Sequence, residues 1–341
     1  MTVRFGGESA VSRRGLLKLG AAAGLALPLG AVGARALSAA PAAGLKPLKF
    51  AWNTGGVCGA PVAVALHKGI YAKHGLDVEF INFAGSTEQL LESLATGKAD
   101  AGIGMALRWL KPLEQGFDVK ITAGTHGGCM RLLAAKTAGI ADIKGLRGKA
   151  VAISDLSSPA KHFFSIVLAK LGIDGNKEVE WKVFPGDLLG AAVERGEAHA
   201  VAHWDPVTFN FLKSGNLVEI ATNLDGEFSN RVCCIVGVRG SLLREDKPTA
   251  AALTRALIEA HDYTAAHPEE AAAVYQQYSP KSNLADLTAM LKSETHNHHP
   301  VGGDLKKELA LYTDELKLMQ IFKPTTDTAK FADKIYADVL A

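Results

Sequence analysis

LLESLATGKADAGIG at residues 90–104 and LLGAAVERGEAHAVA at residues 188–202 are two copies of one pattern. Each copy begins with two leucines, passes through a glycine and ends in a run of small residues that is typical of a buried strand. Each is followed by a helix-like stretch that closes in glycine, LEQG at 113–116 and LKSG at 212–215. The repeat predicts two similar lobes, each with the carboxyl ends of its strands facing a shared crevice.

Strand and helix patterns alternate along both halves of the chain, which predicts mainly parallel sheets with right-handed crossovers. The run RVCCIVGV at 231–238 predicts a strand that is buried on both faces and returns to the first lobe. We therefore expect an α/β protein of two lobes, each a mainly parallel sheet flanked by helices, joined by two hinge crossovers. The expected ranges are 46–136 for the first lobe, 137–228 for the second, and 229–341 for the return strand and C-terminal helices of the first.

Residues 1–40 differ from the rest of the chain and predict an export signal. A polar start is followed by SRRGLLKLG at 12–20, an Ala/Gly/Leu-rich run and small residues before position 41. The pair Arg13 and Arg14 predicts the twin-arginine type of signal. Glycines and Pro28 interrupt the apolar run, which disfavours a membrane anchor. We expect the leader to be removed and the mature protein to be periplasmic.

Composition and charge narrow the function classes. Without residues 1–40 the chain has 32 basic and 34 acidic side chains, a formal net charge of −2, so nothing indicates nucleic-acid binding. All four cysteines follow the leader. We expect the adjacent Cys233 and Cys234 to point to opposite faces of a strand and hence not to bond to each other.

The order of several motifs resembles periplasmic solute-binding proteins of ABC importers, most closely the nitrate, sulfonate and taurine type. The motifs are GGVCGAP at 55–61, HKGIYAKHGLDVEF at 67–80, GSTEQLLESLATGKADAGIG at 85–104, IKGLRGKAVAI at 143–153 and HWDP at 203–206. The similarity covers about residues 48–290. It implies a type II periplasmic binding protein fold, whose two lobes close on a small ligand that is then delivered to a membrane permease.

Three helix openings at strand ends are candidate walls of the crevice. Glycines allow a tight bend there, and proline or a capping hydroxyl begins the next helix, so that free N–H groups face the crevice. Such openings favour an anionic ligand, although ordinary turns and helix caps would leave the same pattern. The residues at these openings are Trp52, Asn53, Gly56, Gly85, Ser86, Thr87, Ser157 and Ser158.

The resemblance adds the end of a second-lobe strand to the site. Members of the family often have an aromatic residue, an acid and proline there, which implies that His203, Trp204 and Asp205 lie in the cleft. Trp204 would offer a stacking face or an N–H donor. His199 stands where the family commonly has aspartate, and we expect it to be a half-buried structural histidine.

Cysteine and histidine side chains also lie near predicted strand ends. Gly104 and Met105 end the third strand, and His126 and Cys129 follow the fourth. Together with Cys58 and either Cys233 or Cys234, these groups could hold a thiophilic metal or a metal complex. The chain has no CxxC motif, and buried free cysteines that fill apolar space are the alternative, so the metal question stays open. For HNHHP at 296–300 we expect a solvated loop.

The RVCCIVGV strand is also similar to the cysteine-rich strand of the pyrimidine synthases of thiamine biosynthesis, which share the two-lobed fold. Their reacting histidine aligns with Arg108, and their pyridoxal phosphate lysine aligns with Gly104. Without these two reactants we expect no enzyme and no cofactor. Import of a thiamine pyrimidine precursor, stacked between Trp52 and Trp204, is a remaining alternative.

The sequence thus predicts an exported, monomeric protein that captures a small anionic solute, such as nitrate, a sulfonate or taurine. The expected partners are this solute and the permease of an ABC transporter. The alternatives are a pyrimidine precursor, a metal or metal complex bound through Cys and His, and a pyrimidine synthase-like enzyme.

Overall fold

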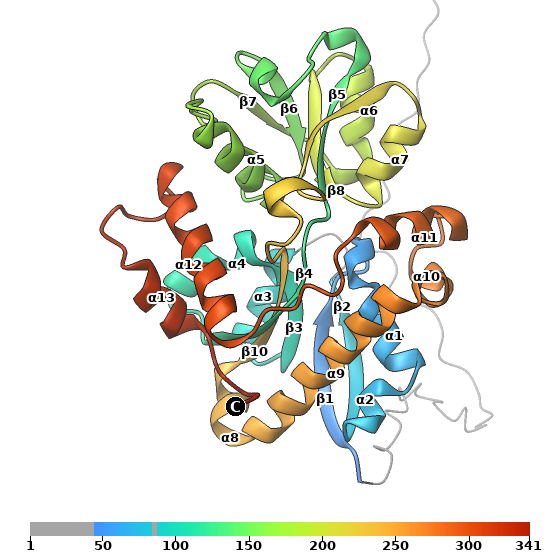
Figure 1. Ribbon diagram of the computed structural model, residues 1–341, viewed down its shortest axis with the longest axis vertical. Helices are drawn as coiled ribbons and strands as arrows, with labels where there is room; N and C mark the ends of the chain where they lie inside the picture. Colours follow the sequence, from blue (N-terminus) through green and yellow to red (C-terminus); the bar gives the residue numbers. More distant parts are fainter. Residues whose placement is uncertain (1–43, 84–86) are drawn as a thin grey trace, which may run out of the picture. The chain divides into compact units, whose positions relative to one another are not determined.

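The computed structural model describes residues 44–83 and 87–341. The predicted leader at 1–40, the bend at Gly85 and Ser86, and the side chain of Thr87 lie outside the described residues. The described strands form two five-stranded sheets, one in each lobe (Figure 1). In the described part of the chain, no helix has both the length and the apolar character needed to cross a membrane.

The first sheet has the strand order β2-β1-β3-β10-β4. Strand β1 pairs in parallel with β2 and β3, whereas β10 runs antiparallel between β3 and β4. The small residues of β3 are buried throughout, as expected for a central strand. The strands are β1 Lys46–Trp52, β2 Leu76–Asn82, β3 Ala101–Met105, β4 Val119–His126 and β10 Cys234–Arg239.

The second sheet repeats this arrangement, with the order β7-β6-β8-β5-β9. Strand β6 pairs in parallel with β7 and β8, and β5 runs antiparallel between β8 and β9. The predicted two-lobed α/β fold is therefore confirmed, with one antiparallel strand inserted into each sheet. The strands are β5 Met130–Ala135, β6 Ala150–Ile153, β7 Glu180–Val183, β8 Ala200–Trp204 and β9 Leu217–Thr222.

The chain crosses between the sheets twice, from β4 to β5 and from β9 to β10. Strand β5 already belongs to the second sheet, so the expected lobe boundary after residue 136 falls six residues beyond the start of this strand. The reason is that β4 and β5 are separated by three residues and are both apolar, so the pattern carries no sign of the change of sheet.

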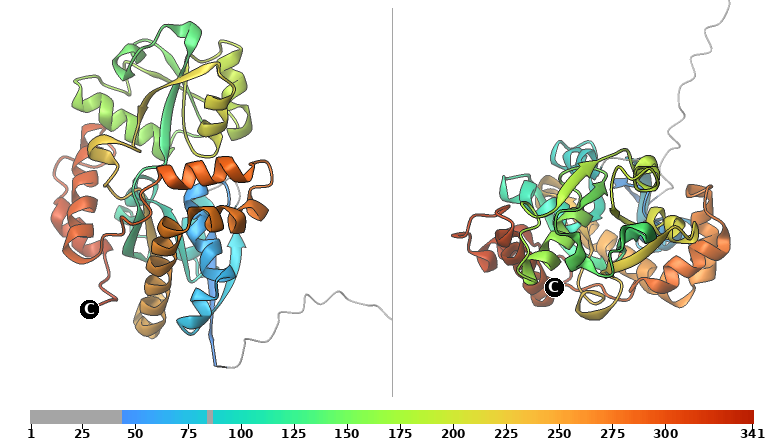
Figure 2. Two further views of the ribbon diagram at one scale, coloured as in Figure 1. Left: turned by 45° about the vertical axis from the view of Figure 1, so that its right-hand side comes forward. Right: turned by 90° about the horizontal axis from the view of Figure 1, so that it is seen from above.

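Helices cover both faces of each sheet (Figure 1). In the first lobe, α1 Ala60–His67 and the long α9 Lys247–Ala266 lie side by side (Figure 2). Helix α1 ends before Gly69, whose φ of +68° favours glycine, and the chain continues as α2 Ile70–Lys73. The other helices of this lobe are α3 Thr87–Ala95, α4 Ala106–Glu114, α8 Gly240–Glu245, α10 Pro268–Tyr275, α11 Leu284–Ser293, α12 Gly302–Leu318 and α13 Thr328–Ile335.

In the second lobe, α5 Pro159–Lys170 lies on one side of the sheet, and α6 Leu189–Glu194 and α7 Val207–Lys213 lie on the other (Figure 1). Proline occupies the first turn of α5, as the sequence predicts. The N–H of Ala150 donates to Nδ1 of the half-buried His199, which fits the structural role expected for this histidine.

Candidate ligand-binding site

A small cavity lies where the strand ends of the two lobes meet. Its volume is about 40 Å³, enough for about three water molecules. Trp204, at the end of β8, contributes the second-lobe part of its wall. The lining residues are Asn53, Gly56, Cys58, Gly59, Ile103, Gly104, Met105, Trp204 and Cys234. Six of these residues are predicted site residues, and they come from the first strand's end, the third strand's end and the second lobe.

Gly56 lies between the sulfur of Cys58 and the ring of Trp204. A Cβ atom there would lie 3.2 Å from the sulfur of Cys58 and 3.6 Å from the Trp204 ring. The bend that carries Gly56 is stabilised by the buried Tyr275. Its hydroxyl oxygen lies within hydrogen-bond distance, 2.8 Å, of the carbonyl oxygens of both Thr54 and Gly56. No local pattern singles out Tyr275, because it lies on α10, more than 200 residues away from the bend that it supports.

The first N–H group at the opening of α1 makes a contact between the lobes. The N–H of Val57 donates to the carbonyl oxygen of Asp205 at 3.2 Å, and the N–H of Gly59 donates to Gly56. The short helix Val57–Gly59 precedes α1 and has no side-chain cap. The N–H of Val57, just before α1, is therefore already paired in this arrangement of the lobes.

The ring of Trp204 packs against the ring of a buried histidine, His203. The rings of His203 and Trp204 are 3.7 Å apart between centroids and nearly perpendicular, at 85°. Burial lowers the pKa of His203 to about 3, so its ring is uncharged at neutral pH. His203 thus supports Trp204 from within the second lobe.

The carboxylate of Asp205 is fully buried and bound within its own lobe. It accepts hydrogen bonds from the guanidinium of Arg131, the hydroxyl of Thr208 and the N–H of Phe209. These bonds anchor the end of β8 to the start of α7 and so fix the direction of Trp204. The structure places the Asp205 side chain in a supporting role, although the sequence grouped it with the ligand-binding residues.

A second and larger cavity, of about 650 Å³, lies beside the contact between α4 and α5. Its wall includes Arg108, Lys111 and Ser157. Arg108 is almost fully buried and forms an ion pair with Asp155 of the second lobe at 2.8 Å. Ser158 is completely buried at the start of α5, and its hydroxyl has no hydrogen-bond partner among the described residues. The serine opening of the second lobe therefore adjoins this cavity and not the one beside Trp204.

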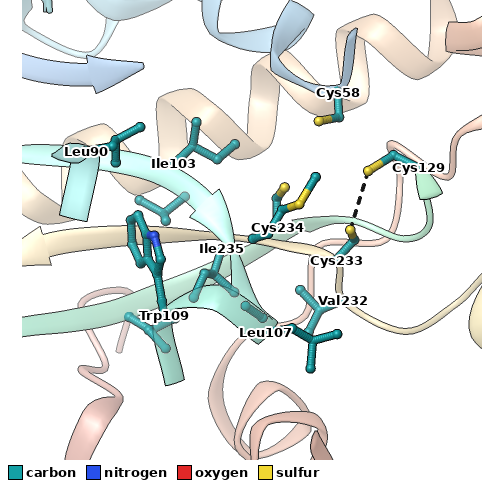
Figure 3. Packing of buried hydrophobic residues seen from close by; sticks show 14 of the residues in the cluster. Cys58, Leu90, Ile103, Leu107, Trp109, Cys129, Val232, Cys233, Cys234 and Ile235 are labelled. Atoms are coloured by element: carbon teal, nitrogen blue, oxygen red, sulfur yellow. Dashed lines mark hydrogen bonds between the residues drawn. The ribbon is translucent and has the colours of Figure 1, made fainter. Parts of the chain in front are cut away.

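All four cysteines lie close together (Figure 3). His126 lies within reach of them. The sulfur atoms of Cys129 and Cys233 are 3.5 Å apart, and no disulfide links any of the four. The ligand atoms of Cys58, His126 and Cys129 lie within 4.8 Å of one another, and so do those of His126, Cys233 and Cys234. Cys58 and Cys234 line the small cavity.

The expectation that Cys233 and Cys234 point to opposite faces of a strand was wrong. The strand β10 begins at Cys234, and Cys233 precedes it; the pairing with β4 also shifts register after Cys234. Strict alternation applies only inside a regular strand. Both thiols can therefore approach the same ring of His126.

Close packing of the thiols shifts their acidity. Hydrogen bonds from the thiols of Cys129 and Cys234 lower the pKa of Cys58 and of Cys233, and the same contacts raise the pKa of Cys129 and of Cys234. Burial lowers the pKa of His126, but the sulfur atoms of Cys58 and Cys233 more than compensate, so the net direction is upward. The cluster thus favours thiolate character at two of its four sulfur atoms.

A chain of buried polar groups continues behind His126. His126 stacks on His261, with the ring centroids 6.2 Å apart, and His296 adjoins both rings. Burial lowers the pKa of His296 to about 3 and raises the pKa of Glu294 well above its usual value. The HNHHP segment is therefore not the solvated loop expected from the sequence, since His296 is buried. His298 and His299 are paired with Glu308 and Asp262.

Trp52 is a core residue. It is 1% exposed and packs against the rings of Phe80, Tyr275 and Tyr278. It does not line the small cavity. Of the other predicted residues, His126, Cys129 and Cys233 lie in the cysteine cluster behind the cavity wall.

Comparison with known proteins places the chain in a family. A family model described as NMT1/THI5 like matches residues 59–271. The chain belongs to the NMT1/THI5-like family. A binding protein of Brucella abortus (strain 2308) is 24% identical over 226 residues, which cover 65% of this chain and 69% of that protein.

Solved structures of periplasmic binding proteins have the same fold. The alkanesulfonate-binding protein SsuA from Xanthomonas axonopodis pv. citri, bound to MOPS, has a TM-score of 0.71 at 17% identity and covers 86% of this chain and 99% of its own. The periplasmic nitrate-binding protein NrtA from Synechocystis PCC 6803 has a TM-score of 0.72 at 16% identity, with 87% of each chain covered. The predicted relationship to solute-binding proteins of the nitrate and sulfonate type is confirmed at the level of family and fold.

Gly104, which we expect to align with the lysine of the pyrimidine synthases, has no room for a side chain. A Cβ atom on Gly104 would lie 2.4 Å from the ring of Trp109, which is fully buried and also fills the space beside Gly237. Arg108, in place of the reacting histidine, is engaged with Asp155. The residues aligned with the reactants of the synthases thus perform packing and lobe contact in this chain.

Proposed function

We propose that the protein is an exported solute-binding protein of an ABC importer. It encloses a small solute between Trp204 and the strand ends of the first lobe, and then delivers it to the transporter permease. The single observation that carries this proposal is the cavity beside Trp204, whose wall is built from both lobes. The proposal needs no catalytic residue, since capture depends on shape and on a few polar or soft groups.

Contacts between the lobes support a closing motion around this cavity. The Val57–Asp205 hydrogen bond lies next to the cavity, and the Arg108–Asp155 ion pair lies beside the second cavity. A third contact joins Lys170 on α5 with Glu315 on α12 at 2.8 Å. A fourth joins Lys213 on α7 with Asp286 on α11 at 2.6 Å. Polar links of this kind can break and re-form as two lobes open and close.

The resemblance favours a small anion such as nitrate or a sulfonate as the solute, and the volume of the cavity favours a solute of few atoms. A substituted pyrimidine has more atoms than a space for about three water molecules can hold, so its capture would require a more open arrangement. None of the described residues that line the small cavity is cationic. The wall of the second cavity includes Arg108 and Lys111 but also Glu92, and the two cations are already paired with Asp155 and Glu114. An organic anion therefore fits the second cavity better in size, with a volume of about 650 Å³.

Isothermal titration of the purified full chain tests this proposal. The panel consists of nitrate, taurine, alkyl sulfonates, bicarbonate, pyrimidine precursors and transition metals. We expect one solute class to bind at one site per chain. The bound solute should be recovered chemically unchanged. Turnover of any panel member by the purified protein would instead place the chain with the enzymes of its family.

A further inference from the structure

We propose that the captured solute is a single thiophilic metal ion of the zinc, cadmium or copper(I) class, bound by the cysteine cluster. The cysteine cluster comprises Cys58, His126, Cys129, Cys233 and Cys234. This inference deepens the proposed function and rests on it only for the delivery of the ion to a permease.

Convergence of the cysteines is the first argument. The chain has four cysteines in 341 residues, in three segments far apart in the sequence, and all four meet at one place. Cysteines that only fill apolar space are not expected to gather at one place in the core. Thiolate sulfur and imidazole nitrogen together are the donor set that selects soft and borderline metal ions.

The spacing of the donors fits a metal ion. Two sulfur atoms bound to one tetrahedral ion at about 2.3 Å lie about 3.8 Å apart. The sulfur atoms of Cys129 and Cys233 are 3.5 Å apart, and the other donors of the cluster lie within 4.8 Å in each group of three. Small side-chain rotations would therefore bring three or four donors to bonding distance.

His126 gives independent support. It is completely buried, and neither of its ring nitrogens has a hydrogen-bond partner among the described residues. A buried polar group without a partner costs stability unless a ligand satisfies it. His126 also belongs to both groups of three donors, which together include all four thiols.

The cavity provides the route to the cluster. Cys58 and Cys234 form part of its wall, and the thioether of Met105 lines it as a further soft donor. Cys129, Cys233 and His126 lie deeper (Figure 3 shows the cysteines). An ion that enters between the lobes therefore meets sulfur donors first and is covered by Trp204 when the lobes approach.

The charge balance suits this buried site. Two thiolates neutralise a divalent ion, and any proton that these thiols carried before binding passes to the solvent. The remaining thiols and the imidazole coordinate as neutral donors or stay protonated. A full set of four thiolates would leave a buried net negative charge, and no cationic side chain lines the described cavity to offset it.

Titration of the reduced full chain with Cd²⁺ under argon tests the inference. Thiolate–metal charge-transfer absorption and native mass spectrometry report the binding and its stoichiometry, and a pair of spin labels, one in each lobe, reports closure. We expect one Cd²⁺ per chain, the same for Zn²⁺, no binding of Mg²⁺, and a shorter distance between the labels on binding.

The double substitution Cys129→Ser/Cys233→Ser should weaken binding by about 100-fold or more. Cys58→Ser/Cys234→Ser, which changes only the cavity side, is the second test if the first variant fails to fold.

His298→Gln/His299→Gln is the matched control, because these two histidines are paired with Glu308 and Asp262 and lie outside the cysteine cluster. It should bind Cd²⁺ normally. The inference is overturned if the folded, reduced chain binds no Cd²⁺, if the cysteine variants bind it normally, or if the exported protein carries a disulfide among these cysteines. Closure by an anion without metal binding would overturn the inference and keep the proposed function. Metal binding without closure would overturn the role of the ion as solute.

Discussion

The guanidinium of Arg108 in the first lobe lies 2.8 Å from the carboxylate of Asp155 in the second lobe. Burial alone would raise the pKa of Asp155, but Arg108 and the hydroxyl of Ser154 reverse this, so the net pKa is lowered and the carboxylate is ionised at neutral pH. The pair is therefore an electrostatic link that exists only when the lobes are close together.

Asp155→Asn should weaken this link without removing hydrogen bonding altogether. Because the Asp155 side chain is 41% exposed, we expect a loss of about 1 kcal/mol or less, which is roughly fivefold in solute affinity. Isothermal titration checks the affinity. Asp174→Asn, which changes an ion pair with Lys177 inside the second lobe, is the matched control and should have no effect. Equal losses in both variants would show that the Arg108–Asp155 link is not specific to closure.

Trp204→Ala should reduce solute affinity by tenfold or more while the fold is retained, because the cavity loses its second-lobe wall. Trp181→Phe is the control, since Trp181 lies on β7 and its indole N–H donates to Gly175. Circular dichroism checks the fold of both variants. Normal affinity in Trp204→Ala would remove Trp204 from the site.

Tyr275→Phe should loosen the bend at Thr54 and Gly56. The hydroxyl that holds these carbonyl groups is lost, and the free energy of unfolding should fall by about 1 kcal/mol. Solute affinity should fall with it, because the bend forms the cavity wall. Tyr278→Phe also removes the hydroxyl of a tyrosine that packs on Trp52. The hydrogen-bond partner of this hydroxyl is the exposed His67, so we expect little change in urea unfolding. A larger effect of Tyr278→Phe than of Tyr275→Phe would contradict this assignment.

Gly104→Ala should destabilise the protein by about 1–3 kcal/mol, because the new Cβ atom overlaps the buried ring of Trp109. Gly303→Ala, at the start of α12, meets no atom within 4 Å and should be neutral or slightly stabilising. Thermal unfolding compares the two. An unchanged melting temperature in Gly104→Ala would mean that Trp109 can move, and that a lysine could be accommodated there.

The stability of the protein should fall as the pH drops from about 6.5 toward 3. Burial holds the pKa of His203 at about 3 in the folded state, whereas an unfolded histidine titrates near 6.5. Between these values the unfolded chain binds more protons, so acid favours unfolding, by about 2–3 kcal/mol for this residue at pH 4.5. His203→Gln should flatten the pH dependence of the free energy of unfolding, measured by urea titration at pH 7.5 and 4.5. An unaltered slope would show that His203 is not buried in its neutral form.

The sequence was sufficient for the fold because the repeat at 90–104 and 188–202 and the alternation of strands with helices follow from local periodicity. It also placed Gly56, Gly104 and Trp204 at strand ends that meet. It did not separate Trp52, which faces the core, from Asn53, which faces the cavity, because one residue decides the face of a strand. Tyr275 was missed, since its role depends on a contact between segments far apart in the chain.

The cysteines illustrate the same limit. Their residue types indicated soft-metal chemistry, but without a CxxC spacing only the folded chain could bring Cys58, Cys129 and the pair Cys233 and Cys234 to one ring of His126. The direction of Cys233 depends on where β10 begins, which hydrophobic pattern alone does not determine.

The distance between one spin label in each lobe, measured on the full chain with and without solute, tests the central claim most directly. We expect one class of small solute, thiophilic ions or anions, to shorten this distance at one equivalent per chain. Trp204→Ala should abolish the change. A distance that stays the same with every member of the titration panel would contradict capture between the two lobes.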